Sequence, residues 1–163
     1  VNNAMWVKYE PMAEVQEDVY RRQMAIGLDA VFWGIQAVTP HMIAQGAGSI
    51  VNMTSPASVH GIPNGSVYAA VKGAISALTR QCAVELGQKG IRVNAVAPTF
   101  IWTDLTATTL SRPGMEEQLT SRIPLGRLGL PTDVAPAVAF LMSEQAGMIT
   151  GHVLAIDGGY TIH

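Results

Sequence analysis

A long helix that separates two short apolar runs constrains the fold of this chain more than any other feature. Residues 49–53 and 91–97 are runs of the kind that form buried strands. Between them, residues 66–86 carry apolar side chains at helical spacing, namely Val71, Ile75, Leu78, Cys82 and Leu86. Because a strand, a helix and a second strand follow one another, the sequence predicts an α/β fold with a parallel sheet and a right-handed crossover.

The rest of the chain adds helices, a third strand and two loops. The predicted elements are helices at residues 14–26, 28–44 and 131–142, a turn at 45–48, and a last strand at 152–156. Residues 56–66 are rich in Pro, Gly, Ser and Asn and predict a loop, after which Ser66 is expected to be the N-cap of the long helix. Residues 103–121 are polar, helical in parts and broken at Pro113-Gly114, so we expect them to form a lid.

Composition and charge exclude several classes of function. Of the 163 residues, 48% are hydrophobic and 13% charged, which indicates one folded domain over residues 1–163. The formal net charge of −2 provides no basic field for nucleic acid or for an anionic membrane. The single cysteine, Cys82, has no partner for an internal disulfide, and no leader or membrane-spanning run is visible, so we expect a cytoplasmic protein. No histidine has metal-ligand spacing with a Cys, Asp or Glu cluster, so no metal is predicted.

Three residues with complementary chemistry fall where the predicted elements meet. Tyr68 and Lys72 are four residues apart on the long helix, so their side chains share one face. Ser55 lies at the carboxyl end of the first strand, the edge at which parallel sheets bind ligands. A phenol is a poor acid–base catalyst at neutral pH, but a nearby ammonium lowers its pKa. Hydride has to come from a cofactor, because no side chain supplies it. A Tyr–Lys pair alone also fits an ordinary solvated pair.

Several blocks of sequence together identify a family. Residues 49–55 (SIVNMTS), 68–74 (YAAVKGA), 91–98 (IRVNAVAP) and 149–159 (ITGHVLAIDGG) occur in the order and spacing of a short-chain dehydrogenase/reductase. The segment 124–129 (PLGRLG) followed by Pro131 is similar as well. The resemblance implies a Rossmann-like doubly wound parallel sheet, incomplete at the N-terminal side, and hydride transfer between an alcohol and a carbonyl with NAD or NADP as cofactor.

The resemblance also implies roles for individual residues. Ser55 orients the oxygen of a small-molecule alcohol or carbonyl substrate, Tyr68 is the general acid/base, and Lys72 lowers the pKa of Tyr68 and binds the nicotinamide ribose. The remaining expected cofactor contacts are Asn3 and Ala4 beside the adenosine ribose, and Pro98, Thr99, Ile101 and Thr103 beside the nicotinamide carboxamide and phosphate. A homodimer or homotetramer is expected, with contacts through residues 28–44, 66–87 and 152–156 and through a strand after Val1 that is left as an open edge.

The sequence departs from the family pattern in three ways. It contains no Gly-x-x-x-Gly-x-Gly loop to hold the pyrophosphate. Gly27 stands where the family has a catalytic asparagine. Met5 and Thr99 replace glycines close to the expected cofactor, where an added Cβ crowds the site. Two functions therefore stay open, an NAD(P)-dependent oxidoreductase and a catalytically inactive or truncated homologue that retains only the fold and subunit contacts.

Other residues are assigned to packing or to the surface. Cys82 lies on the apolar stripe of the long helix and is expected to be in the core, whereas Phe32 and Trp33 lie in an apolar helix and are expected to be packing residues. His60 follows Ser55 in the loop and is expected to be exposed, although contact with substrate is the alternative.

Overall fold

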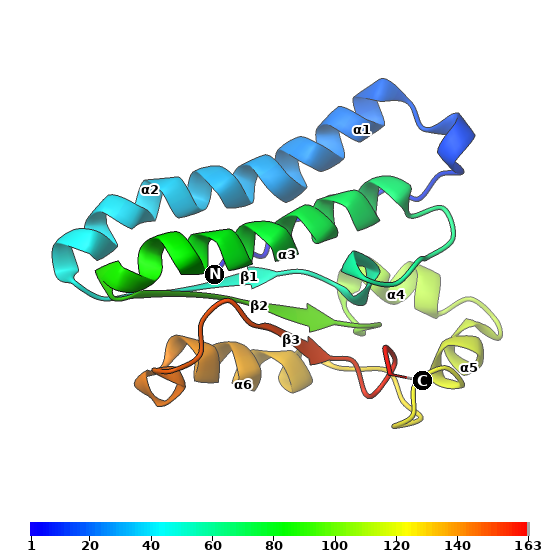
Figure 1. Ribbon diagram of the computed structural model, residues 1–163. Helices are drawn as coiled ribbons and strands as arrows, with labels where there is room; N and C mark the ends of the chain where they lie inside the picture. Colours follow the sequence, from blue (N-terminus) through cyan, green and yellow to red (C-terminus); the bar gives the residue numbers. More distant parts are fainter. Residues whose placement is uncertain (163) are drawn as a thin grey trace.

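Three parallel strands form the sheet, and the computed structural model describes residues 1–162. The strands are β1 (Gly48–Met53), β2 (Ile91–Pro98) and β3 (Val153–Ile156), in the order β1-β2-β3. Their register aligns Ile50 with Val93 and Val96 with Leu154. Both crossovers contain helices, as Figure 1 shows. The predicted α/β class with a small parallel sheet is confirmed.

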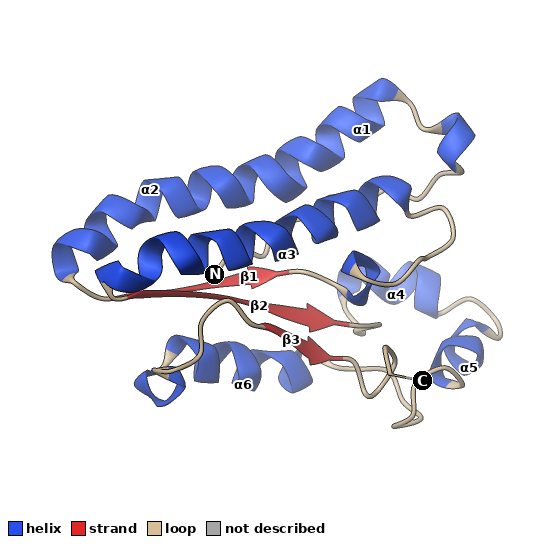
Figure 2. Cartoon of the chain, in the orientation of Figure 1, coloured by secondary structure: helices blue, strands red, loops and turns tan. Residues whose placement is uncertain are grey.

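Helices cover both faces of this sheet (Figures 1 and 2). One face carries α2 (Ala30–Gln45) and α3 (Ser66–Leu86), and α1 (Glu17–Met24) packs on α3. The other face carries α6 (Pro131–Met142). The short helices, α4 (Asp104–Leu110) and α5 (Met115–Thr120), lie beyond the carboxyl ends of the strands and are separated by the predicted Pro113-Gly114 break.

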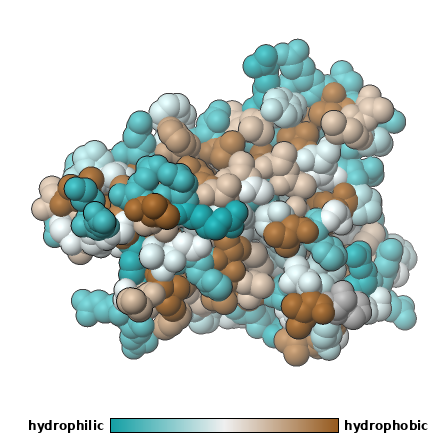
Figure 3. Space-filling model, in the orientation of Figure 1, coloured by the Kyte–Doolittle hydropathy of each residue, from teal (hydrophilic) through white to brown (hydrophobic). Residues whose placement is uncertain are grey.

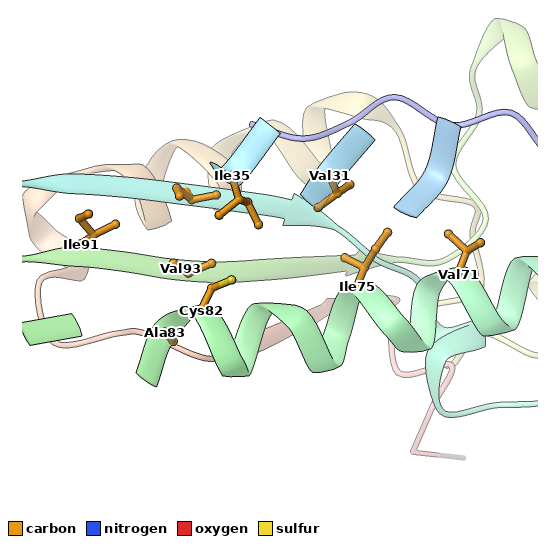
Figure 4. Close-up of a cluster of buried hydrophobic side chains, with 9 residues drawn as sticks. Val31, Ile35, Val71, Ile75, Cys82, Ala83, Ile91 and Val93 are labelled. Carbon is orange, nitrogen blue, oxygen red and sulfur yellow. The ribbon is translucent and has the colours of Figure 1, made fainter. Parts of the chain in front are cut away.

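Two apolar clusters form because successive residues of a strand face opposite sides of a sheet. Ile50 and Val93 face α2 and α3, where Figure 4 shows Val93 beside Cys82. Val51 and Val96 face α6 instead and pack against residues that include Val134, Leu141 and Ala146. Burial on both faces explains why the strands read as continuous apolar runs rather than as alternating ones. The predicted core position of Cys82 is confirmed.

The first two predicted helices form one continuous helical rod. Residues 25–29 (Ala25–Asp29) adopt a π-helix between α1 and α2, and Gly27 lies buried within it. Glu14, predicted as the helix start, belongs to a separate 3₁₀ turn, Met12–Glu14. Pro40 is accommodated inside α2, where the Thr39 hydroxyl donates to the Ile35 carbonyl oxygen (2.7 Å).

Two local predictions were wrong. The strand expected after Val1 is a single bridge between Asn2 and Asn52, made by Asn2 N–H to the Val51 carbonyl (2.9 Å) and Met53 N–H to the Asn2 carbonyl (3.0 Å). Ser66 is the first helical residue of α3 and Gly65 is the N-cap, so the Ser66 hydroxyl does not cap the helix.

The surface carries apolar side chains outside the core. Figure 3 shows separate hydrophobic patches among hydrophilic residues on one face. Phe32 and Trp33 of α2, predicted to be packing residues, contact each other with ring centroids 5.0 Å apart and are 45% and 58% exposed. Among the described residues, none of the helices is long and apolar enough to cross a membrane.

Candidate active site

The carboxyl end of β1 is fastened to α3 by buried hydroxyl groups. The Thr54 hydroxyl donates to the Lys72 carbonyl oxygen (2.8 Å) and lies 2.8 Å from the Ser76 hydroxyl. Ser76 also donates to the Lys72 carbonyl (3.0 Å). Because all three residues are buried, these bonds fix the end of the strand against the turn of α3 that carries Lys72. The sequence analysis did not assign this role to Thr54 and Ser76. Their positions could have indicated it, because Thr54 directly precedes Ser55 and Ser76 lies one helical turn after Lys72.

Ser55 is held in a turn directly after this attachment. It is 8% exposed and extended, and its Oγ accepts a hydrogen bond from the Ala57 backbone N–H (3.2 Å). That bond caps the 3₁₀ turn Pro56–Ser58. The hydroxyl hydrogen of Ser55 is left available to a neighbouring acceptor.

Tyr68 reaches Ser55 from the first turn of α3. Burial raises the pKa of Tyr68 above its ordinary value, and the interaction with the Ser55 hydroxyl lowers that pKa by less. Tyr68 and Ser55, thirteen residues apart in sequence, are therefore neighbours, as helix start and strand end were expected to be. The phenol is protonated at neutral pH in this state of the chain.

Lys72 lies one helical turn after Tyr68 and is buried. Its Nζ donates to the Met53 carbonyl oxygen (2.8 Å) and lies 5.7 Å from the centre of the Tyr68 ring. Burial lowers the pKa of Lys72 to about 8. The expected lowering of the Tyr68 pKa by Lys72 is not found here, because burial dominates at Tyr68 and the ammonium is directed to the strand end.

The residues expected to contact the nicotinamide lie beyond β2. Pro98 ends that strand, and the Thr99 N–H donates to the Ile156 carbonyl (3.3 Å). Thr99 and Ile101 line a cavity of about 570 Å³. Thr103 caps α4, where its N–H donates to Thr106 Oγ1 (2.9 Å). This cavity is not lined by Ser55, Tyr68 or Lys72, so its size alone does not locate the chemistry.

Asn3 and Ala4 lie at the other side of the site. Both are exposed and follow the Asn2 bridge to β1. Asn2 is anchored by its Nδ2, which donates to Asn52 Oδ1 (2.8 Å). Asn3 and Ala4 are therefore positioned at the sheet edge next to β1, whereas Thr99 and Ile101 follow β2.

Met5 fills space next to Gly27 instead of pointing away from the core. A Cβ on Gly27 would lie 2.6 Å from Val71 Cγ1 and 2.9 Å from Met5 Sδ. Met5 also packs against the cluster that contains Val31, Val71 and Ile75. An asparagine side chain does not fit at position 27 beside these two neighbours. The replacement of the family's asparagine by Gly27 therefore accompanies the replacement of its glycine by the larger Met5.

Two further residues approach the site. His60, expected to be exposed, is half-buried and packs edge-on against the Tyr160 ring with centroids 5.5 Å apart. Tyr9 packs against the Tyr68 ring at 5.8 Å. No sequence signal identified Tyr9, because residues 5–11 show neither helical nor strand periodicity. Among residues 1–162 no three His, Cys, Asp or Glu residues are grouped to hold a metal ion.

The comparison with known families agrees with this arrangement. Residues 1–161 match the family model described as enoyl-(acyl carrier protein) reductase. The chain belongs to the short-chain dehydrogenase/reductase family. Human L-xylulose reductase is 40% identical over 161 residues, which cover 98% of this chain and 66% of that protein. Galactitol 2-dehydrogenase (L-tagatose-forming) of Cereibacter sphaeroides is 39% identical and is matched over 65% of its length by 99% of this chain.

Solved structures of short-chain dehydrogenases superpose closely. A gluconate 5-dehydrogenase from Burkholderia cenocepacia, in complex with NADP and tartrate, has a TM-score of 0.97 and 34% identity, with 99% of this chain and 64% of that chain covered. The chain thus spans about two-thirds of the length of its relatives. The sheet of three strands, with a single bridge at Asn2, is the structural counterpart of that partial coverage.

Proposed function

We propose that this chain supplies the acid–base half of an NAD(P)-dependent oxidoreductase that interconverts an alcohol and a carbonyl. The observation that carries the proposal is the contact between Tyr68 and Ser55, with Lys72 one turn further along the same helix. Relatives named as reductases and dehydrogenases of sugars and polyols support the reaction class.

The proposed roles follow from the hydrogen-bonding capacity of each group. In the reducing direction the Tyr68 hydroxyl donates its proton to the carbonyl oxygen, and the Ser55 hydroxyl donates a hydrogen bond to the same oxygen. Lys72 has one N–H bound to the Met53 carbonyl, which leaves two for a ribose hydroxyl or a water. The Lys72 charge stabilises the phenolate that remains on Tyr68 after the proton has left.

The residues present fit the nicotinamide half of the cofactor better than its phosphate half. Lys72 offers donors, and Thr99 and Ile101 line a cavity beyond β2. Pro98 and Thr103 lie on the same connection, and Asn3 and Ala4 lie at the edge next to β1. NADH or NADPH, when bound, would supply the hydride in the reducing direction, and NAD or NADP would accept it in the oxidising direction. The chain offers no glycine-rich loop for the pyrophosphate.

Replacement of Tyr68 tests the proposal directly. In the protein that contains this chain, with NADPH and a ketone substrate, Tyr68→Phe is expected to reduce kcat by at least about a hundredfold, the range typical of a lost general acid. Tyr20→Phe is the matched control, because Tyr20 is 45% exposed on α1 and is expected to leave kcat unchanged. Equal turnover by Tyr68→Phe and the unsubstituted protein rejects the proposed role.

The alternative is a homologue without turnover. Gly27 and the missing phosphate loop favour it, since neither the usual asparagine nor a pyrophosphate cradle is present. The absence of turnover of any ketone with NADH or NADPH, and of any secondary alcohol with NAD or NADP, from a protein shown to be folded, supports this alternative.

A further inference from the structure

Tyr9 is held rigidly beside Tyr68 although no expected role required it. The backbone is fixed on both sides of it: Gln23 Nε2 donates to the Lys8 carbonyl (3.2 Å), and the Glu10 N–H donates to the Asn64 carbonyl (3.0 Å). Gln23 is 1% exposed, so the first of these bonds is shielded from water. A Lys8–Glu10 ion pair (2.6 Å) closes over the same segment.

The Tyr9 side chain uses this anchorage to approach the Tyr68 ring. The two rings meet edge to face, with centroids 5.8 Å apart and planes at 60°. Tyr9 is 52% exposed, so one side of it borders solvent at the mouth of the site. The ring contact accounts for an aromatic residue at this position, but phenylalanine makes that contact equally well.

The hydroxyl group of Tyr9 adds a hydrogen-bonding capacity that the ring contact does not use. Within residues 1–162 it has no hydrogen-bond partner among the side-chain and backbone groups. Burial raises the pKa of Tyr9 to about 12, and the charge of Tyr68 raises it further in the same direction. This second effect agrees with the 5.8 Å distance between the two ring centroids, which brings the Tyr9 phenol next to that of Tyr68. Tyr9 thus remains a neutral hydrogen-bond donor even when Tyr68 is ionised.

We infer that Tyr9 is a specificity-determining residue whose hydroxyl binds an oxygen on the carbon next to the reacting carbonyl, which favours α-hydroxy ketones and vicinal diols. The inference rests on the proposed function, because Tyr68 and Ser55 must hold the reacting oxygen. With that oxygen at Tyr68, the atoms of the adjacent carbon are the next part of the substrate to meet Tyr9. A neutral donor at this point stabilises a hydroxyl there and gives nothing to a methylene.

A matched pair of substrates isolates this contact. Acetoin and 2-butanone share a four-carbon skeleton and differ by one hydroxyl on the carbon next to the carbonyl. With NADPH, the unsubstituted protein is expected to have a kcat/KM for acetoin about tenfold above that for 2-butanone, the effect of one neutral hydrogen bond. Tyr9→Phe is expected to reduce this ratio to about one, mainly by raising KM for acetoin. The kcat/KM for 2-butanone is expected to change by less than about twofold.

The controls separate this inference from the proposed function. Tyr20→Phe is expected to keep the tenfold ratio, whereas an unchanged ratio in Tyr9→Phe overturns the role of Tyr9 and leaves the oxidoreductase intact. If neither ketone is turned over, binding is followed by NMR of protein labelled with ¹³Cζ-tyrosine. Shifts of the Tyr9 and Tyr68 signals by acetoin but not by 2-butanone then support the role of Tyr9 without turnover, and the absence of such shifts overturns it.

Discussion

The sulfur of Met5 lies 2.9 Å from the position that a Cβ on Gly27 would occupy. Val71 Cγ1 is closer still, at 2.6 Å from the same point. Met5 is a flexible side chain that can move aside, whereas Val71 is β-branched and fully buried. Val71 directly precedes Lys72, whose Nζ donates to the Met53 carbonyl, so a side chain at position 27 would press on the neighbour of that donor.

Gly27→Ala is therefore expected to destabilise the chain even though alanine favours helices. The overpacking costs about 1–3 kcal/mol, which exceeds the gain in helix propensity of at most about 1 kcal/mol. The measurement is the free energy of unfolding in urea.

A double-mutant cycle identifies the source of this loss. In a Val71→Ala background the cost of Gly27→Ala is expected to fall by at least about 1 kcal/mol, because the cavity receives the new methyl group. A Met5→Ala background is expected to recover less. Additive effects of Gly27→Ala and Val71→Ala contradict the steric explanation.

The buried charge of Lys72 predicts how stability depends on pH. The pKa of Lys72 is lowered from 10.5 to about 8 in the folded chain, so the unfolded chain binds the proton more tightly. Stability consequently rises with pH through this window, by about 2 kcal/mol between pH 8 and pH 10. Above pH 10 the raised pKa values of Tyr9 and Tyr68 act in the opposite direction, because the unfolded chain then loses its tyrosine protons first.

Lys72→Met tests this origin of the rise. The variant is expected to lose the rise between pH 8 and pH 10 and to show a decrease instead, because the raised pKa values of Cys82, Tyr9 and Tyr68 remain; Lys89→Met, at an exposed lysine, retains the rise. A rise of the same size in Lys72→Met assigns it to another group.

Much of the fold was predictable from apolar periodicity, and much of the site from motif spacing. The strands at residues 49–53 and 91–97 and the helix at 66–86 are found within one residue of their predicted bounds, since their apolar residues are buried on both faces of the sheet. The π-helix at residues 25–29 was not predicted, because apolar periodicity does not reveal how closely Val71, on another helix, approaches Gly27. The same limit applies to Tyr9, whose neighbours Lys8 and Glu10 bond to Gln23 and Asn64, far from them in sequence.

Self-association is expected through α2. Phe32, Trp33, Val38 and Ile43 are between 38% and 58% exposed on this helix, and apolar groups gathered in this way favour burial against a partner. Light scattering at micromolar concentration is expected to show a dimer or tetramer. Trp33→Glu is expected to lower the measured mass toward that of the monomer. Met148→Glu, at a fully exposed residue outside α2, is the control and is expected to leave the mass unchanged. A well-behaved monomer of the unsubstituted chain contradicts this prediction.

The 163-residue chain by itself is expected to bind NADP weakly, because it offers no cradle for the pyrophosphate that joins the two halves of the cofactor. Lys72, Thr99 and Ile101 offer contacts to the nicotinamide half, but the sequence has no glycine-rich loop followed by a helix N-terminus to hold the pyrophosphate. Nicotinamide mononucleotide, which lacks the adenosine half, should then bind this chain within about threefold of NADP, a difference below about 0.7 kcal/mol. Calorimetry of both ligands on the same preparation measures the ratio, and Lys72→Met should weaken both together. Micromolar binding of NADP, or a preference for it of a hundredfold, shows that another part of this chain holds the pyrophosphate.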